Sequence, residues 1–145
     1  MKKTILNVEN LRTSFYTHLG EVQAVRGTSF ELKEGDVLGI VGESGSGKSV
    51  TSLSIMGLIE EPGIIKEGSV INFDGMELTE MSNKELSEIR GDEIAMIFQD
   101  PMTSLNPVYT IKNQMIEVIR RHTDLTKEEA FDRAVELLEM VGIPE

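Results

Sequence analysis

Eight consecutive residues, 42–49, combine the side chains and the backbone freedom that a phosphate-binding loop requires. They are Gly42-Glu43-Ser44-Gly45-Ser46-Gly47-Lys48-Ser49 and fit the pattern G-x-x-x-x-G-K-[ST] without a mismatch. Glycines in such a loop allow successive backbone N–H groups to point inward at phosphate oxygens. We expect the Lys48 ammonium to reach the β- and γ-phosphates of a nucleotide and the Ser49 hydroxyl to ligate Mg²⁺. The segment is therefore predicted to hold a nucleoside triphosphate.

The residues on both sides of this loop predict the strand and the helix that must position it. Residues 37–41, Val-Leu-Gly-Ile-Val, are a short apolar run after a turn signal and predict a strand buried on both faces, as in a parallel sheet. Residues 49–59 contain no proline and predict a helix that ends before Pro62-Gly63. The phosphates would then lie at a helix N-terminus, where free N–H groups and the helix dipole favour anions. The alternative is a Gly/Ser-rich turn with an exposed lysine.

The composition limits the size of the fold and the kinds of partner. A chain of 145 residues with 39% hydrophobic content can bury one modest core, which predicts one domain. The net charge of −11 disfavours a nucleic-acid partner, because a phosphate backbone is bound by positive charge. The absence of cysteine excludes disulfides and thiolate metal sites. The sequence contains no run that approaches 18 apolar residues, so we expect a soluble chain or the soluble subunit of a larger assembly.

Four further segments have the composition of strands. Residues 4–11 and 24–33 predict antiparallel strands around a polar loop at 17–21. Residues 69–73 alternate polar and apolar side chains and then turn at Asp74-Gly75, which is typical of a hairpin. Residues 94–98, Ile-Ala-Met-Ile-Phe, predict a second buried strand.

Two capping boxes and one apolar face predict three helices in the second half of the chain. Ser82 and Glu85 form a capping box that opens a short helix ending near Gly91, and Thr126 and Glu129 form another. A third helix begins at Thr110. The apolar faces expected for the last two helices contain Ile111, Met115, Val118 and Ile119 in one, and Ala130, Ala134, Leu137, Leu138 and Val141 in the other, with Gly142 as the C-cap.

A phosphate loop alone occurs in GTPases, kinases, motor ATPases and transporters, and residues 96–107 distinguish between these classes. Because of these residues, the chain resembles the ATP-binding subunits of ABC transporters, in particular the oligopeptide/dipeptide (and nickel) importer branch. Four features occur in the order typical of that family. They are Val8-Glu9-Asn10-Leu11, the phosphate loop preceded by Val41, Ile97-Phe98-Gln99-Asp100-Pro101, and Ser104-Leu105-Asn106-Pro107. The resemblance covers the whole chain.

The resemblance implies an α/β fold, a P-loop NTPase core of the ABC ATPase type with an antiparallel β subdomain and the start of a helical subdomain. Residues 1–145 would form a partial nucleotide-binding domain. Within it, residues 1–34 would be mainly the β subdomain, 35–100 the phosphate-loop core up to the Q-loop, and 101–145 the Q-loop and the first part of the helical subdomain.

The resemblance also implies roles for individual residues in binding ATP and Mg²⁺. Gln99 resembles the Q-loop glutamine, whose amide oxygen contacts Mg²⁺ or the attacking water, so that Ser49 and Gln99 form the metal pair and Lys48 and Gln99 the catalytic pair. Phe15 best matches the aromatic residue that stacks on adenine. Tyr16 is the second choice, and plain core packing of Phe15 stays an alternative. Val50 departs from the many relatives with a hydroxyl there, so the α-phosphate contact would depend on backbone N–H groups.

The implied partners are integral membrane permease subunits, a second ABC ATPase subunit and, indirectly, an extracellular or periplasmic peptide-binding protein. No nucleic acid is expected. The chain would lie peripherally on the cytoplasmic face of the membrane and couple ATP hydrolysis to peptide import, with dipeptides, oligopeptides and nickel all open as substrates. Met102, Leu105 and Tyr109 are expected near the permease contact.

Several family motifs do not occur in the sequence. It contains no LSGGQ-type signature and no apolar run ending in Asp-Glu, and its histidines, His18 and His122, are expected at the surface rather than as a switch histidine. We therefore expect an N-terminal fragment that binds nucleotide and hydrolyses it negligibly. The alternatives are a soluble ABC ATPase of DNA repair or translation and a non-catalytic nucleotide-binding module. A P-loop GTPase is disfavoured because no Asn-Lys-x-Asp segment occurs.

Overall fold

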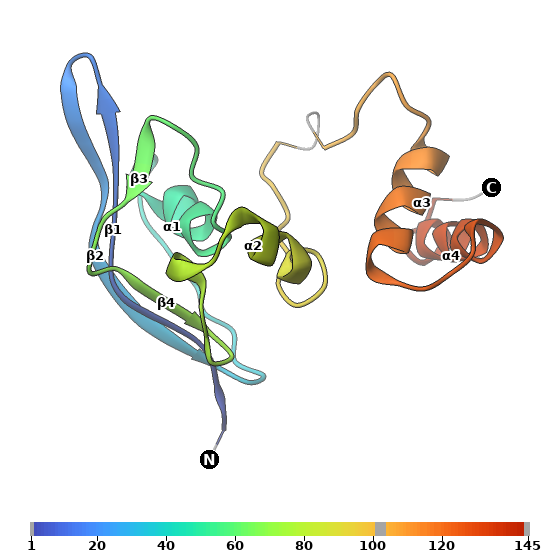
Figure 1. Cartoon of the computed structure of the whole chain (residues 1–145), viewed down its shortest axis with the longest axis horizontal. Helices are drawn as coiled ribbons and strands as arrows, with labels where there is room; N and C mark the ends of the chain where they lie inside the picture. Colours follow the sequence, from blue (N-terminus) through green and yellow to red (C-terminus); the bar gives the residue numbers. More distant parts are fainter. Residues whose placement is uncertain (1, 101–103, 144–145) are drawn as a thin grey trace. The chain divides into compact units, whose positions relative to one another are not determined.

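Figure 1 shows the chain in a computed structural model that describes residues 2–100 and 104–143. The chain divides into two compact units, Met1–Arg90 and Gly91–Glu145. The first unit contains the sheet and the phosphate loop, and the second contains a pair of helices. The three-part division at residues 34 and 100 inferred from the sequence stays a prediction.

The first unit is built on a long antiparallel hairpin. Strand β1 (Thr4–Thr17) pairs with β2 (Gly20–Lys33), which confirms the antiparallel pairing predicted from the sequence. Both strands run further than predicted, because the Thr17 hydroxyl accepts a hydrogen bond from the Leu19 N–H and donates one to the Gly20 carbonyl, closing a short turn.

Two of the other strands of this sheet lie beside β1, and the last lies beside β4. Strands β3 (Gly63–Ile65) and β4 (Val70–Phe73) both pair with β1 antiparallel, and β5 (Met76–Glu77) pairs with β4. The sheet order is β2-β1-β4-β5, with β3 off this path on β1. The predicted hairpin turn after residue 73 is confirmed. Asp74 has a φ of 47° and Gly75 a φ of 88°, conformations that Asp and Gly tolerate best.

A bulge in β1 keeps its apolar residues on one face of the sheet. Strict alternation would place Val8 and Leu11 on opposite faces, yet both are fully buried. The register with β2 shifts between these residues, and Asn10 lies there with a φ of 49°. One extra residue restores the phase, as in β-bulges generally. The core of this unit therefore continues along β1 to Thr13, whose hydroxyl lies 2.8 Å from that of Ser54 on helix α1.

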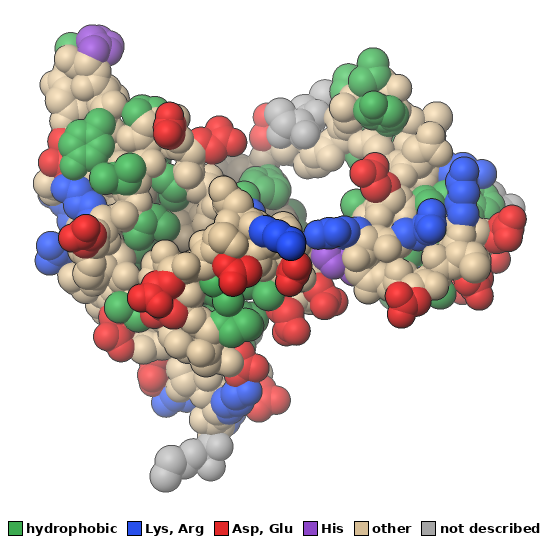
Figure 2. All heavy atoms as spheres, viewed as in Figure 1, with side chains coloured by type: hydrophobic (Ala, Val, Ile, Leu, Met, Phe, Trp, Pro, Cys, Tyr) green, Lys and Arg blue, Asp and Glu red, His purple; other side chains and the backbone are tan. Residues whose placement is uncertain are grey.

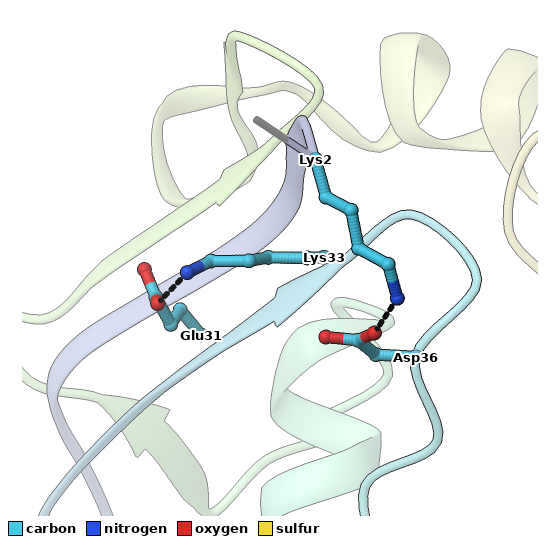
Figure 3. A network of polar contacts seen from close by, with 4 residues as sticks. All are labelled: Lys2, Glu31, Lys33 and Asp36. Carbon is cyan, nitrogen blue, oxygen red and sulfur yellow. Dashed lines mark hydrogen bonds and ion pairs between the residues drawn. The ribbon is translucent and has the colours of Figure 1, made fainter.

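Exposed ion pairs hold the end of β2 and the turn that follows it (Figure 3). Lys33 Nζ lies 2.9 Å from Glu31 Oε1, and the hydrogen bond from this carboxylate raises the pKa of Lys33. Lys2 pairs with Asp36 in the turn after the strand. Because all four side chains are 42–60% exposed, these pairs fix local geometry more than they add stability.

Helices α1 (Lys48–Ile55) and α2 (Asn83–Ile89) complete the first unit, together with the short 3₁₀ helix η1 (Leu78–Glu80). Helix α1 ends four residues earlier than the predicted limit of residue 59, because Gly57 adopts a φ of +62° that stops the helix. The capping box predicted for α2 is confirmed, since the Ser82 hydroxyl accepts from the Glu85 N–H and the Glu85 carboxylate accepts from the Ser82 N–H.

Two strand predictions are wrong. Residues 37–41 and 94–98 were expected to form strands buried on both faces, but neither run is a β-strand, and Val37 and Ile97 are each 98% exposed. Apolar composition predicts such a strand only if other strands pair with it on both sides. In the part of the chain that the structure describes, no strand pairs with either run.

The second unit is a helical hairpin of α3 (Ile111–His122) and α4 (Lys127–Met140), as predicted. Thr110 caps α3, and Thr126 and Glu129 form the expected capping box of α4. Gly142, with a φ of +79°, ends α4, and the Ile143 N–H donates to the Leu138 carbonyl at 2.9 Å.

The buried face of α3 differs from the predicted one. Ile116 is its buried residue, whereas Ile111 and Val118 are 52% and 61% exposed. One packed helix covers only a narrow stripe, and that stripe is centred on Ile116. On α4, Ala130 and Ala134 are buried as predicted, whereas Val141, expected on the same face, lies at the end of the helix and is 72% exposed.

The outer surface is strongly charged. On the face that Figure 2 shows, acidic side chains occur on both units, in keeping with the net charge of −11. Among the helices of residues 2–100 and 104–143, none has the length and apolar character needed to cross a membrane.

Candidate phosphate-binding site

The loop 42–47 leads directly into α1, so it presents the free N–H groups of a helix N-terminus. Gly47 is the N-cap residue with a φ of 91°, and Gly45 has a φ of 79°. Both values lie in the left-handed region that glycine adopts without steric cost. The first turn of α1 carries no acidic residue that would compete with a bound anion. The helix predicted from Ser49 begins one residue earlier, at Lys48, and its backbone geometry suits an anion.

Gly47 is required here by space as well as by conformation. A Cβ on Gly47 would lie 2.4 Å from the carbonyl oxygen of Ala24 in β2. A Cβ on Gly42 would lie 2.5 Å from the hydroxyl oxygen of Ser46. The loop thus packs against the backbone of β2 at Gly47, where only glycine fits, and it folds close to its own Ser46 side chain at Gly42.

Lys48 lies across the loop. Its Nζ donates hydrogen bonds of 2.7 Å to the carbonyl oxygens of Gly42 and Glu43, and it lies 3.4 Å from the Ser46 hydroxyl. The Lys48 side chain is half-buried, and its ammonium group contacts the backbone of the loop that precedes it. This arrangement places a positive charge beside the N-terminal N–H groups of α1, where both attract the same anion.

The three residues after Lys48 differ in exposure and in role. Ser49 is exposed and Val50 is half-buried. Thr51 is buried, and both its N–H and its hydroxyl donate to the Gly47 carbonyl, at 2.8 and 2.9 Å. The Thr51 hydroxyl therefore supports the loop from inside the helix. Sequence analysis did not assign it this role, although a hydroxyl within the first helical turn was the available signal.

Strand β2 forms a wall beside the loop that sequence analysis did not identify. A polar hollow of about 280 Å³ is lined by residues 23–28 of β2 and by Gly45, Ser46 and Thr51. No local pattern could have found it, because it depends on how β2 lies against a loop about 20 residues away. A larger hollow of about 730 Å³ lies in the second unit along α3 and is lined mainly by polar and basic side chains, with Ile116 and Val118 also in its wall. It lacks a glycine loop.

The predicted adenine-stacking residue is half-buried. The ring of Phe15 lies over Gly63, since a Cβ there would lie 2.6 Å from Phe15 Cε1 and 2.7 Å from Ile59 Cγ2. This contact supports the core-packing alternative, and adenine stacking stays a prediction. Tyr16, the second choice, is 48% exposed, and Lys66 Nζ lies 5.9 Å from its ring centroid.

The two residues of the predicted metal pair belong to different units of the chain. Ser49 belongs to the first unit, whereas Gln99 is an exposed residue of the second, so their joint role stays a prediction. Across the described ranges, no group of three His, Asp or Glu residues could hold a metal ion. Mg²⁺ commonly binds through substrate phosphates and one or two protein oxygens, and the Ser49 hydroxyl beside a phosphate loop fits that pattern.

The predicted permease-facing residues can be placed only in part. Leu105 and Tyr109 are 49% and 62% exposed. Met102 lies outside the described residues. The exposure of the first two leaves them available to a partner.

Comparison with known proteins agrees with the loop geometry. Residues 25–145 match the family described as ABC transporter. The oligopeptide transport ATP-binding protein OppD of Bacillus subtilis is 55% identical over 141 residues, which are 97% of this chain and 39% of that protein. The dipeptide transport ATP-binding protein DppD of Lactococcus lactis is 46% identical over 145 residues, 99% of this chain and 41% of that protein. The chain thus spans about two fifths of the length of the curated relatives it matches.

Solved structures confirm the predicted α/β fold class. The dimeric structure of MJ0796, a bacterial ABC transporter cassette, superposes with a TM-score of 0.80 at 25% identity and covers 94% of this chain and 56% of that chain. A post-hydrolysis dimer of the same cassette bound to ADP and Pi gives a TM-score of 0.77 at 23% identity over the same shares and shows the fold alone.

Proposed function

Since this chain belongs to the ABC transporter family, we propose that its residues 42–49 bind the phosphates of Mg-ATP as part of the ATP-binding subunit of a peptide importer. The observation that supports this most is the loop itself. Gly47 at a φ of 91° packs on the Ala24 carbonyl, and Lys48 lies across the loop where α1 begins.

Each residue of the loop contributes to binding by charge and position. The N–H groups at the start of α1 would donate to phosphate oxygens, and the Lys48 ammonium would exchange one of its carbonyl contacts for an oxygen of the β- or γ-phosphate. Val50 has no hydroxyl, so the α-phosphate would be bound by the Val50 N–H, while the Thr51 N–H donates to the Gly47 carbonyl. Mg²⁺, when bound, neutralises charge on the β- and γ-phosphates. The Ser49 hydroxyl would hold it, with Gln99 as the further proposed ligand.

The proposed substrate class follows the relatives' names. OppD and DppD are named as oligopeptide and dipeptide transport ATP-binding proteins, which supports peptides over nickel. We infer that the protein works with membrane permease subunits and a second ATP-binding subunit, peripherally on the cytoplasmic face. Hydrolysis requires a carboxylate that polarises the attacking water, and the sequence has no apolar run ending in Asp-Glu to supply it. We therefore propose that these 145 residues bind ATP far better than they hydrolyse it.

A ligand-stabilisation experiment tests the nucleotide proposal. Mg-ATP at 100 times its Kd should stabilise the chain by about 2.7 kcal/mol and raise its melting temperature. Lys48→Ala should abolish the shift, whereas Lys84→Ala, which removes an exposed lysine of α2 away from the loop, should retain it. An equal shift in Lys48→Ala, or none in the unmodified chain, would contradict the proposal.

Two activity measurements test the remaining parts. Phosphate release by the purified chain should not exceed that of Lys48→Ala, and a clear excess would contradict the proposed lack of hydrolysis. In vesicles that contain the whole importer, Lys48→Ala in this subunit should abolish ATP-dependent uptake of a labelled peptide. Uptake at the unmodified rate would contradict the transport role.

A further inference from the structure

The end of the phosphate-loop helix is held by a side chain far along the sequence. The Arg90 guanidinium donates two hydrogen bonds of 2.7 Å, from Nε to the Met56 carbonyl and from Nη2 to the Gly57 carbonyl. These carbonyls lie at the C-terminal end of α1, where Met56 is the C-cap. Such carbonyls have no partner within the helix, and the negative end of the helix dipole attracts a cation.

The surroundings of Arg90 fix its side chain in this place. A Cβ on Gly57 would lie 2.8 Å from Arg90 Nη2 and 2.7 Å from Leu86 Cδ1. Gly57 therefore provides the space for the guanidinium as well as the left-handed turn that ends α1. The Arg90 N–H donates to the Leu86 carbonyl at 3.0 Å. The backbone of Arg90 is therefore fixed by α2, while its side chain binds the end of α1. All of these residues belong to the first unit.

The opposite end of the same helix forms the phosphate loop. Helix α1 has only 8 residues, and a helix of this length is not stable without tertiary contacts. Its described contacts include the Thr13–Ser54 hydroxyl pair at 2.8 Å in the middle and Arg90 at the end. Loss of the end contact allows the last turn to fray, which leaves little more than one turn to orient the N–H groups of the loop.

We propose that Arg90 is a positioning residue for the nucleotide site and that it couples nucleotide binding to the end of α2. This inference rests on the proposed nucleotide binding at residues 42–49. Arg90 is also the last residue of the first unit, directly before the segment that leads to Gln99. Coupling free energies are reciprocal, so a nucleotide that orders α1 must also strengthen the Arg90 contact and protect the backbone around it.

The test compares Arg90→Ala and Arg90→Lys with Arg133→Ala, which removes an exposed arginine from α4. The Kd of Mg-ADP is measured by calorimetry, and hydrogen exchange of residues 86–91 is measured with and without Mg-ADP. Arg90→Ala should raise the Kd about tenfold, within the range of typical coupling, and abolish the nucleotide-induced protection. Arg90→Lys keeps the charge but cannot donate to both carbonyls in the same way, so its Kd should lie between those of Arg90→Ala and the unmodified chain. Arg133→Ala should have the Kd and the protection of the unmodified chain.

Each other outcome overturns the inference in a distinguishable way. If the arginine variants melt at a lower temperature but keep the unmodified Kd and protection, Arg90 is merely structural. If Arg90→Ala does not fold, the same comparison is made with Arg90→Lys, and an unchanged Kd with unchanged protection again refutes the proposal. If the unmodified chain does not bind Mg-ADP, the proposed function itself fails, and this inference fails with it.

Discussion

Replacing Gly47 with alanine should destabilise the chain clearly more than the same replacement at Gly45. Both glycines lie in the phosphate loop with positive φ, 91° and 79°. They differ in space: a Cβ on Gly47 would lie 2.4 Å from the Ala24 carbonyl oxygen, whereas a Cβ on Gly45 would meet nothing within 4 Å. The pair therefore separates the conformational cost of a side chain from its steric cost.

The magnitudes follow from these two terms. A non-glycine residue in the left-handed region costs about 1–2 kcal/mol, and this term applies to both variants. Forcing an extra carbon against packed neighbours costs about 1–3 kcal/mol more, and it applies only to Gly47→Ala. Ala24 lies between Gln23 and Val25, which pair with Ser14 and Thr13 of β1, and these pairs limit how far its carbonyl can move. We expect losses of about 1–2 kcal/mol for Gly45→Ala and about 2–5 kcal/mol for Gly47→Ala.

Urea unfolding without nucleotide, followed by far-UV circular dichroism, measures both losses. With a slope of about 2 kcal/mol/M, the unfolding midpoint of Gly47→Ala should lie about 1 M below that of Gly45→Ala. Omitting nucleotide keeps the loss of ligand contacts out of the comparison. Equal midpoints would show that the loop does not pack on Ala24 and would refute the site geometry.

Three further predictions concern the sheet and the helix caps. Arg26 lies opposite Arg12 in the β1–β2 register, so Arg26→Glu should stabilise the chain by about 0.2–1 kcal/mol in urea unfolding, and high salt should remove the gain; a loss of stability at low salt would contradict this pairing. Gly63→Ala should cost about 1–3 kcal/mol in the same assay, because its Cβ would lie within 2.9 Å of three heavy atoms, and a neutral effect would refute this packing. The pKa of Glu129 is lowered, first by the hydrogen bond from the Thr126 hydroxyl and second by that from the Thr126 N–H. The cap therefore stabilises α4 fully at a pH above 4.5, the ordinary pKa of a glutamate. This stabilisation is lost as the pH falls through the lowered pKa of the folded state. Thr126→Ala should therefore weaken the acid dependence of α4 unfolding, and an unchanged pH profile would count against the capping box.

Local signals in the sequence predicted the parts of the fold that local interactions determine. These parts include the start of α1, predicted at Ser49 and observed at Lys48, and the boxes Ser82–Glu85 and Thr126–Glu129. Each depends on residues no more than a few positions apart. Their side chains and backbone satisfy each other wherever the helices lie. The hairpin of β1 and β2 was likewise predictable, because its strands are neighbours in the sequence.

The features that depend on distant partners were not predictable. Residues 37–41 and 94–98 have strand composition, but whether such a run is a strand depends on what pairs with it. The wall at Ala24 and the Arg90 contact with the end of α1 join residues more than 20 positions apart. Phe15 shows the same limit, since the sequence identified an aromatic residue but not the backbone of Gly63 beneath its ring.

The central claim is that residues 42–49 form the phosphate-binding loop of a nucleotide site. Amide NMR of the ¹⁵N-labelled chain, titrated with Mg-ATP, tests it most directly because it reports binding and its location together. The largest shifts should fall on the N–H groups of residues 43–50, and Lys48→Ala should abolish them while the rest of the spectrum stays folded. Shifts centred on the hollow along α3, or equal shifts in Lys48→Ala, would contradict the claim.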